Sequence, residues 1–256
     1  MNTHTFYEFP LNERIRVFMR LEQLFKQLNH FMNGSTVSDH RAVISVLLDI
    51  LMIFSRNDLK SELLKELDRH AKTLNLISSN QGVDTEKLNS ILLNLKTISK
   101  KLYETNGKIG IKIMESDLFQ SISQRSSIPG GSCSFDLPAF HYWLEQDKEI
   151  QQQDLSQWTQ PLDNIRSAIE LILSFIRQSS LPTQELAAAG FFQLTLDKSQ
   201  SFQLIRVSLD ETLPLFAEIS GGKHRFTIRF MSPSSGTNRP QQITDNVPFS
   251  LTCCVF

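Results

Sequence analysis

The spacing of apolar residues changes once along this chain, near Leu181, and this change constrains the fold more than any other feature. Before that point apolar residues recur every three or four positions, the period of an amphipathic helix. After it they alternate with polar residues, as in half-buried strands. The strand-like segments are 190–197, 201–210, 215–220, 224–231 and 247–254. The pattern predicts an α+β protein, with an N-terminal antiparallel helical bundle domain over 1–180 and a C-terminal antiparallel β-sheet domain over 181–256.

Four long helices joined by short turns are expected in the first hundred residues, and such helices pack as an antiparallel bundle. Capping residues mark where they begin: Leu11–Asn12 for the first, Ser38 or Asp39 for the second, Asn57 or Asp58 for the third, and Asp84 for the fourth. The third helix carries mixed charges that indicate a solvent-exposed side: Lys60, Glu62, Lys65, Glu66, Asp68 and Arg69. A strongly amphipathic helix is also expected from Pro161 to about Ser179.

One mid-chain stretch, 124–144, fits neither period. Pro129 and the Gly130-Gly131 pair break it, and aromatic residues follow. It predicts a junction between two substructures, where binding surfaces tend to lie. Residues 132–137, like residues 5–9 near the start, are candidates for additional strands of the sheet. The glutamine-rich segment 147–160 predicts a mobile loop or a frayed helix.

The segment 223–231 holds the clearest candidate for a binding surface. Strand side chains alternate between two faces. The apolar residues of this segment point into a core, and the opposite face carries Lys223, Arg225, Thr227 and Arg229. Neighbouring cations on one sheet face repel each other unless an anion neutralises them. This row of cations therefore fits either a solvated strand face or a surface that binds an anionic partner.

Charge balance limits the partners that such a surface could have. Lys and Arg number 26 and Asp and Glu 27, so no global field attracts nucleic acid or anionic lipid. Any electrostatic partner must be met by a local patch. Arg16 and Arg20 lie four residues apart on one face of the first predicted helix, and they form either such a patch or an ordinary solvated face.

Motifs for catalysis, metals or cofactors are weak. Cys133 and His141 are too arbitrarily spaced to predict a nucleophile and its base. No GK[ST] follows Gly130-Gly131, so they do not form a phosphate loop. Cys253-Cys254 lacks the partners of a metal site and fits a buried strand better. We therefore expect neither an enzyme nor a bound cofactor. The three cysteines and the lack of a membrane-length apolar run predict a cytoplasmic protein without membrane insertion.

Long ordered motifs give the chain a family resemblance. They are FPLNERIRVFMRLE (9–22), SELLKELDR (61–69), SIPGGSCSFDLPAFHYWL (127–144), IRQSS (176–180), ISGGKHRFTIRFM (219–231) and the paired-cysteine ending. With these motifs the chain resembles the ZapD (Z-ring-associated protein D) family of bacterial cell division proteins. The resemblance covers nearly the whole chain and is weakest over 37–54, the glutamine-rich segment and 232–246.

The resemblance implies a cytoplasmic homodimer, found at midcell, with a helical and a β domain and no enzymatic activity. Such proteins bind the disordered C-terminal tail of FtsZ, the tubulin-like division GTPase, and bundle its filaments. By motif, the basic binding surface falls on Arg20, Arg125, His141, Arg225 and Arg229. The predicted site adds their neighbours Arg16, Lys223 and His224. One departure lies in the short helix before SIPGG, where relatives can carry an arginine and this chain has Asp117.

A second class of function uses the same surface. A basic patch also fits nucleic acid or an anionic membrane. The near-neutral net charge and the absence of a nucleic-acid-binding motif argue against this alternative.

Overall fold

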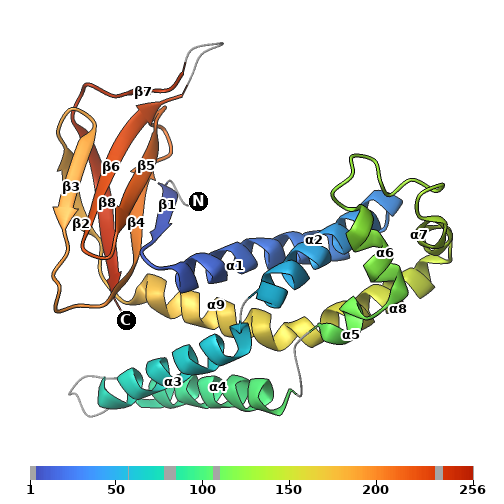
Figure 1. The fold of residues 1–256 in the computed structure, drawn as a ribbon. Coiled ribbons are helices and arrows are strands. Elements are labelled where there is room, and N and C mark those ends of the chain that lie inside the picture. Colours follow the sequence, from blue (N-terminus) through green and yellow to red (C-terminus); the bar gives the residue numbers. More distant parts are fainter. Residues whose placement is uncertain (1–3, 57, 78–84, 106–109, 234–238, 256) are drawn as a thin grey trace. The chain divides into compact units, whose positions relative to one another are not determined.

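The computed structural model describes residues 4–56, 58–77, 85–105, 110–233 and 239–255 (Figure 1). The chain divides into two compact units, one made of Met1–Val17 with Leu173–Phe256 and the other of Phe18–Ile172. The division falls inside two helices, α1 (Glu13–Met32) and α9 (Asp163–Gln178). Strands belong to the first unit and most helices to the second, so the predicted α+β class is confirmed.

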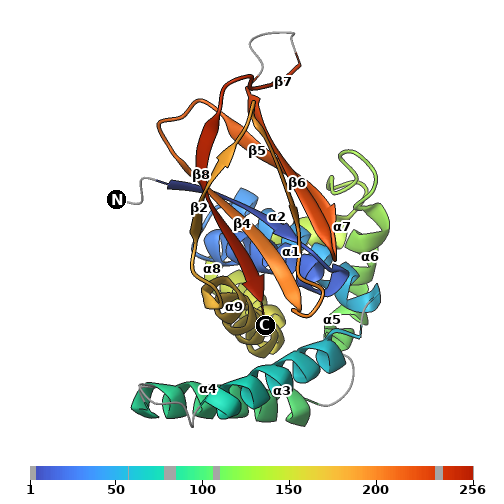
Figure 2. The ribbon, with the colours of Figure 1, turned by 90° about the vertical axis from the view of Figure 1, so that its left-hand side faces the viewer.

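The strands of the first unit form two antiparallel sheets packed face to face (Figures 1 and 2). The first sheet has the order β1 (His4–Pro10), β4 (Phe202–Asp210), β8 (Val247–Val255), β2 (Thr183–Ala187). The second has the order β3 (Phe191–Thr195), β6 (Arg225–Ser232), β5 (Phe216–Gly222), with β7 (Gln241–Gln242) paired to the end of β6. Alternate residues of both sheets fill one core, including Ile205, Val207, Phe226, Ile228, Phe230 and Phe249.

Two segments outside the predicted strand region were candidates for additional strands, and they behave differently. Residues 5–9 lie in β1, whose Glu8 pairs in register with Arg206 of β4. Residues 132–137 form turns and add no strand. Their backbone groups are satisfied locally, since the N–H groups of Asp136 and Leu137 both donate to the carbonyl of Cys133. A segment that closes its own hydrogen bonds has none left to offer a neighbouring strand.

A three-residue ion-pair cluster fixes β1 and the end of α9 to the first sheet. Glu8 of β1 accepts hydrogen bonds from Arg177 of α9 at 2.8 Å and from Arg206 of β4 at 2.7 Å. The Glu8 side chain is only 16% exposed, so the two guanidiniums supply what water would otherwise give its carboxylate.

The hairpin between β5 and β6 turns two residues later than its glycines suggest. The sequence favours a turn at Ser220–Lys223, but Gly222 pairs with Arg225 and the turn is Lys223–His224. Gly221 lies within β5 opposite Phe226, and a Cβ at this position would approach the Cβ of Phe226 to 2.6 Å, so only glycine permits this approach. The glycines thus permit close strand packing and do not form the turn.

The second unit is helical. Its elements beside parts of α1 and α9 are α2 (Val37–Arg56), α3 (Leu59–Ile77), α4 (Thr85–Glu104), α5 (Ile111–Met114), α6 (Asp117–Arg125), α7 (Pro138–Leu144), α8 (Lys148–Thr159) and the 3-10 turn Gln160–Leu162. The helices α3 and α4 pack along each other, and α8 packs on α2 (Figure 1). The predicted cap of α4, Asp84, and one predicted cap of α3, Asn57, lie outside the described residues.

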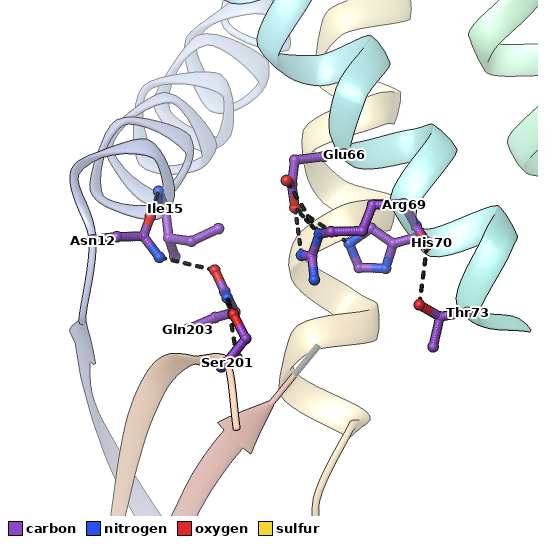
Figure 3. A network of polar contacts seen from close by, with 8 residues as sticks. All are labelled: Asn12, Ile15, Glu66, Arg69, His70, Thr73, Ser201 and Gln203. Atoms are coloured by element: carbon purple, nitrogen blue, oxygen red, sulfur yellow. Dashed lines mark hydrogen bonds and ion pairs between the residues drawn. The ribbon is translucent and has the colours of Figure 1, made fainter. Parts of the chain in front are cut away.

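Local hydrogen bonds explain where the first two helices begin. The carboxamide oxygen of Asn12 accepts the N–H of Ile15 at 2.9 Å, which caps α1 as predicted, and its nitrogen donates to Gln203 of β4 (Figure 3). The cap of α2 is Thr36, neither Ser38 nor Asp39. Thr36 and Asp39 exchange side-chain-to-backbone hydrogen bonds in a reciprocal capping box.

Two features of the second unit correct the sequence interpretation. Within the segment 147–160, predicted as a mobile loop or a frayed helix, residues 148–159 form the helix α8. Its Gln151 is buried. The carboxamide oxygen accepts a hydrogen bond from Nδ1 of His40, and the carboxamide nitrogen donates to the carbonyls of Leu144 and Gln146. Glu66, expected on the exposed side of α3, is only 2% exposed.

The buried carboxylate of Glu66 has a local counter-ion. The guanidinium of Arg69, one turn along α3, lies 2.5 Å from it (Figure 3). A charged group tolerates burial when it is paired and hydrogen-bonded. Charge patterning alone could not distinguish this buried pair from the solvated pairs beside it.

Candidate partner-binding surface

The exposed face of β6 carries two of the predicted binding residues. Arg225, Thr227 and Arg229 are called here the β6 basic face. Phe226, Ile228 and Phe230 alternate with them and are buried in the core, so the predicted alternation is confirmed. Because both guanidiniums project from a central strand with β3 and β5 on either side, their spacing is set by the sheet.

An acidic residue on the neighbouring strand belongs to the same surface. Glu218 of β5 lies opposite Arg229, and its carboxylate accepts a hydrogen bond from the guanidinium at 3.0 Å. The two side chains are 43% and 53% exposed, so solvent screens the pair. The charge of Arg229, one cation of the predicted row, is therefore partly neutralised by a carboxylate of the protein itself.

The remaining cation of the predicted row, Lys223, lies at the hairpin tip beside the predicted site residue His224. Lys223 and His224 are exposed turn residues and do not continue the alternation of β6. The carbonyl of His224 accepts the N–H of Leu196, which holds the tip against the segment after β3. Four predicted site residues therefore lie in this hairpin: Lys223 and His224 in its turn, and Arg225 and Arg229 in β6.

The two predicted arginines of α1 differ in their surroundings. Arg16 pairs with Glu13 at 3.1 Å, and its guanidinium lies 5.7 Å from the ring centre of Phe9. Arg20, four residues along the same helix, is exposed. Arg16 lies in the first unit and Arg20 in the second, at the division within α1.

The two remaining predicted residues flank the connection between α6 and α7, residues 126–137, called here the α6–α7 loop. Arg125 ends α6 and its guanidinium binds the carboxylate of Asp136 at 2.7 Å, which closes the loop at its base. His141 lies on α7, exposed, with Nδ1 3.9 Å from Glu145. Asp117, the departure from the family pattern, is the first residue of α6, where a carboxylate interacts favourably with the helix dipole.

A further cation near the loop escaped the sequence analysis. The guanidinium of Arg41, on α2, donates to the carbonyl and hydroxyl of Ser132 at 3.2 and 3.0 Å and lies 5.1 Å from the ring centre of Phe140. No local sequence pattern links Arg41 to a loop ninety residues away. Glu218 was also missed, because its pairing depends on the position of the hairpin turn.

Two of the three cysteines, Cys253 and Cys254, are not activated as nucleophiles. Burial raises the pKa of Cys253 to about 11 and that of Cys254 to about 12. Both residues lie in β8, as predicted for a buried strand. A thiol whose pKa is that high is almost wholly protonated at neutral pH and is a poor nucleophile or metal ligand.

Comparison with known proteins agrees with these features. The family described as "ZapD: Cell division protein" matches residues 19–229. A cell division protein ZapD of Methylococcus capsulatus is 47% identical over 255 residues, covering 100% of both chains. Those of Chromobacterium violaceum and Nitrosomonas eutropha are 37% and 38% identical and cover 98% and 97% of this chain and 99% and 98% of their own.

These matches assign the molecule to a class and then to a family. An α+β protein with exposed basic surfaces and full-length relatives named for cell division is itself a cell division protein. Within that class, the chain belongs to the ZapD family. Over the described residues, none of the helices has the length and apolar character needed to span a bilayer.

Proposed function

We propose that this chain binds the disordered C-terminal tail of FtsZ and, as a homodimer, crosslinks FtsZ filaments into bundles at the division site. It acts without catalysing a reaction. The observation that carries the proposal is the β6 basic face, where Arg225 and Arg229 are exposed on the same face of a central strand and Arg229 pairs with Glu218 only through a half-exposed ion pair. Membership of the ZapD family supports the choice of a division protein as partner.

Guanidinium groups suit the task of binding an acidic tail. Their fixed forks pair with carboxylates in two parallel hydrogen bonds, and a central strand presents them without flexible backbone. Ordering a disordered tail costs free energy, so each site binds with modest affinity. A dimer that meets a filament bearing many tails regains affinity through multivalency. Weak individual sites then allow bundles to form and exchange.

Charge reversal tests the site. The double variant Arg225→Glu/Arg229→Glu should lose binding to a synthetic FtsZ tail peptide and lose co-sedimentation with filaments, and it should keep its fold because these charges are exposed. The matched control is Lys198→Glu/Arg239→Glu, which makes the same change in net charge at exposed loop positions of the same unit. Normal filament bundling by a folded Arg225→Glu/Arg229→Glu protein would refute the assignment.

Salt and filament controls separate this function from the alternatives. Binding should weaken steeply as salt rises from about 0.05 to about 0.5 M, because the Debye length falls below about 10 Å within this range and the charges are then screened. FtsZ lacking its tail should not be bundled. If the chain instead binds DNA or anionic vesicles as tightly as the tail peptide, the tail is not its specific partner.

A further inference from the structure

The second unit contains a hollow of about 400 Å³ beneath the α6–α7 loop. Ile44 and Leu48 of α2, Ile122 of α6 and Phe140 of α7 line it with apolar atoms, and Ile128 of the loop borders it. The lining also includes polar groups, from Arg41, Ser45, Arg125, Ser126, Ser127 and Ser132. Cavities of a few hundred Å³ that combine apolar walls with polar groups are typical binding sites. The volume suits one or two bulky side chains of a peptide.

Two guanidinium-bearing residues also line this hollow. Arg125 is paired with Asp136, but the described hydrogen bonds of Arg41 go to the neutral groups of Ser132. The lining thus has one more cation than the loop carboxylate can neutralise. An occupant with carboxylates next to its apolar side chain would complement it, since charge-assisted pairs with arginine are strong and directional.

Short-range backbone hydrogen bonds stabilise the loop that borders the hollow. The N–H of Ile128 donates to the carbonyl of Arg125 at 3.0 Å, and that of Gly131 to the carbonyl of Ile128 at 2.9 Å. A Cβ on Gly131 would lie 2.6 Å from the carbonyl oxygen of Arg125, so only glycine permits this approach. A preformed site loses less entropy on binding than one that must first be ordered.

Aromatic and apolar side chains are exposed within the same stretch of chain. Phe135 of the loop is 83% exposed, Tyr142 of α7 is 70% exposed, and Ile128 is 48% exposed. Large apolar side chains held at the surface by rigid backbone are typical of protein-binding surfaces. Of these three residues, Ile128 lines the hollow itself, so the hollow offers an exposed apolar side chain as well as charge to a protein segment.

We propose that the hollow is the apolar anchor site of the FtsZ tail. One bulky apolar residue of the tail enters between α2 and the α6–α7 loop, and the carboxylates flanking that residue bind Arg41 and Arg125. This inference rests on the proposed function and adds an apolar requirement to it. A second copy that presented this same surface would fit less well, because that surface carries the same excess of positive charge.

Filling the hollow tests the proposal directly. Ser45 is an exposed residue of α2 that lines it, so Ser45→Phe should occupy part of the space without disturbing the core. Ser38→Phe is the matched control, the same change at an exposed position of the same helix outside the hollow. Loss of one buried apolar side chain should weaken tail-peptide binding about tenfold to a hundredfold in Ser45→Phe and not in Ser38→Phe.

A second measurement does not depend on any variant. In methyl-labelled wild-type protein, the tail peptide should shift the NMR signals of Ile44, Ile122 and Ile128. Replacing one apolar residue of the peptide by Ser should abolish those shifts and weaken binding. Replacing its neighbouring acidic residues by amides should weaken binding to wild type, and it should weaken binding less in Arg41→Gln, where only Arg125 remains to pair with them.

The outcomes separate this inference from the proposed function. If the peptide binds and Arg225→Glu/Arg229→Glu abolishes binding, but the three methyl groups do not shift and Ser45→Phe binds normally, the function stands and the anchor site is wrong. If the peptide does not bind wild-type protein at all, both fail. If Ser45→Phe dissociates a dimer in analytical ultracentrifugation and leaves peptide affinity intact, the hollow belongs to a second copy and the proposal is overturned.

Discussion

Replacing Glu218 by Gln should strengthen binding of the FtsZ tail, because Glu218 competes with the tail for Arg229. The carboxylate of Glu218 lies 3.0 Å from the guanidinium, on a neighbouring strand of the same exposed face. A tail carboxylate that binds Arg229 must displace it. The Gln variant keeps the shape of the side chain and removes its charge, so the guanidinium is released without a change in packing.

The size of the gain follows from the exposure of the pair. Both side chains are about half exposed, and exposed ion pairs contribute about 0.2–1 kcal/mol. Removing that competition should tighten binding about 1.4- to 5-fold, since 1.4 kcal/mol corresponds to a factor of ten. The gain should shrink as salt rises, because screening weakens both the internal pair and the pair with the tail.

Fluorescence anisotropy of a labelled tail peptide can resolve this change. Glu211→Gln makes the same change in net charge at an exposed position after β4 and should have a smaller effect. In Arg229→Gln, adding Glu218→Gln should give no gain, since nothing remains to be released. An unchanged or weaker affinity of the Glu218→Gln protein would refute the reasoning, and an equal gain in Glu211→Gln would attribute it to net charge alone.

Three further predictions concern stability and reactivity. Glu8→Ala removes the carboxylate that pairs with Arg177 and Arg206, and it should lower the free energy of unfolding by about 3–5 kcal/mol in urea titrations. A loss below about 1 kcal/mol, the value of an exposed ion pair, would contradict this expectation. Hydrogen bonds from the side chain and backbone of Thr36 lower the pKa of Asp39, so its carboxylate stabilises the fold above the ordinary value of about 3.9 and the contribution is lost as pH falls through the lower folded-state value. Asp39→Asn should therefore lower the melting temperature at pH 7 and have less effect at pH 2–3, and a pH-independent difference would contradict this. Cys133 is exposed and should react with a thiol reagent at pH 8 in the folded protein, whereas Cys254, whose burial raises its pKa to about 12, should react only after unfolding, as mass spectrometry of the labelled chain would show.

The sequence predicted what depends on periodicity and failed where tertiary contacts decide. Alternation located the strand that carries Arg225 and Arg229, and Asn12 located the start of α1, because both signals are local. The connection from β2 to β3, which lie in different sheets, gave no comparable signal. Its turn holds Ala189 at φ 48°, a left-handed conformation that glycine or asparagine usually adopts, so the alanines concealed both the turn and the strand β2 before it.

The register of the β5–β6 hairpin decided whether the pairing of Glu218 with Arg229 could be predicted from the sequence. A turn at Ser220–Lys223 would place Pro214 opposite Arg229, whereas the observed pairing places Glu218 there. A turn displaced by two residues moves the partner strand by four, and the competing carboxylate was missed for that reason alone. Arg41 was missed for another reason, since only the folded second unit brings it to Ser132.

The pairing of β1 with β4 sets an order of events during synthesis. Glu8 and Arg206 are 198 residues apart in the chain, and the ribosome adds roughly 5–20 residues per second, so β1 waits about 10 to 40 s for its partner strand. The contiguous unit Phe18–Ile172 is synthesised in that interval and can form its own core. During the same interval the edge of β1 and its Tyr7 and Phe9 are uncovered, which is the condition under which strands mispair or recruit chaperones.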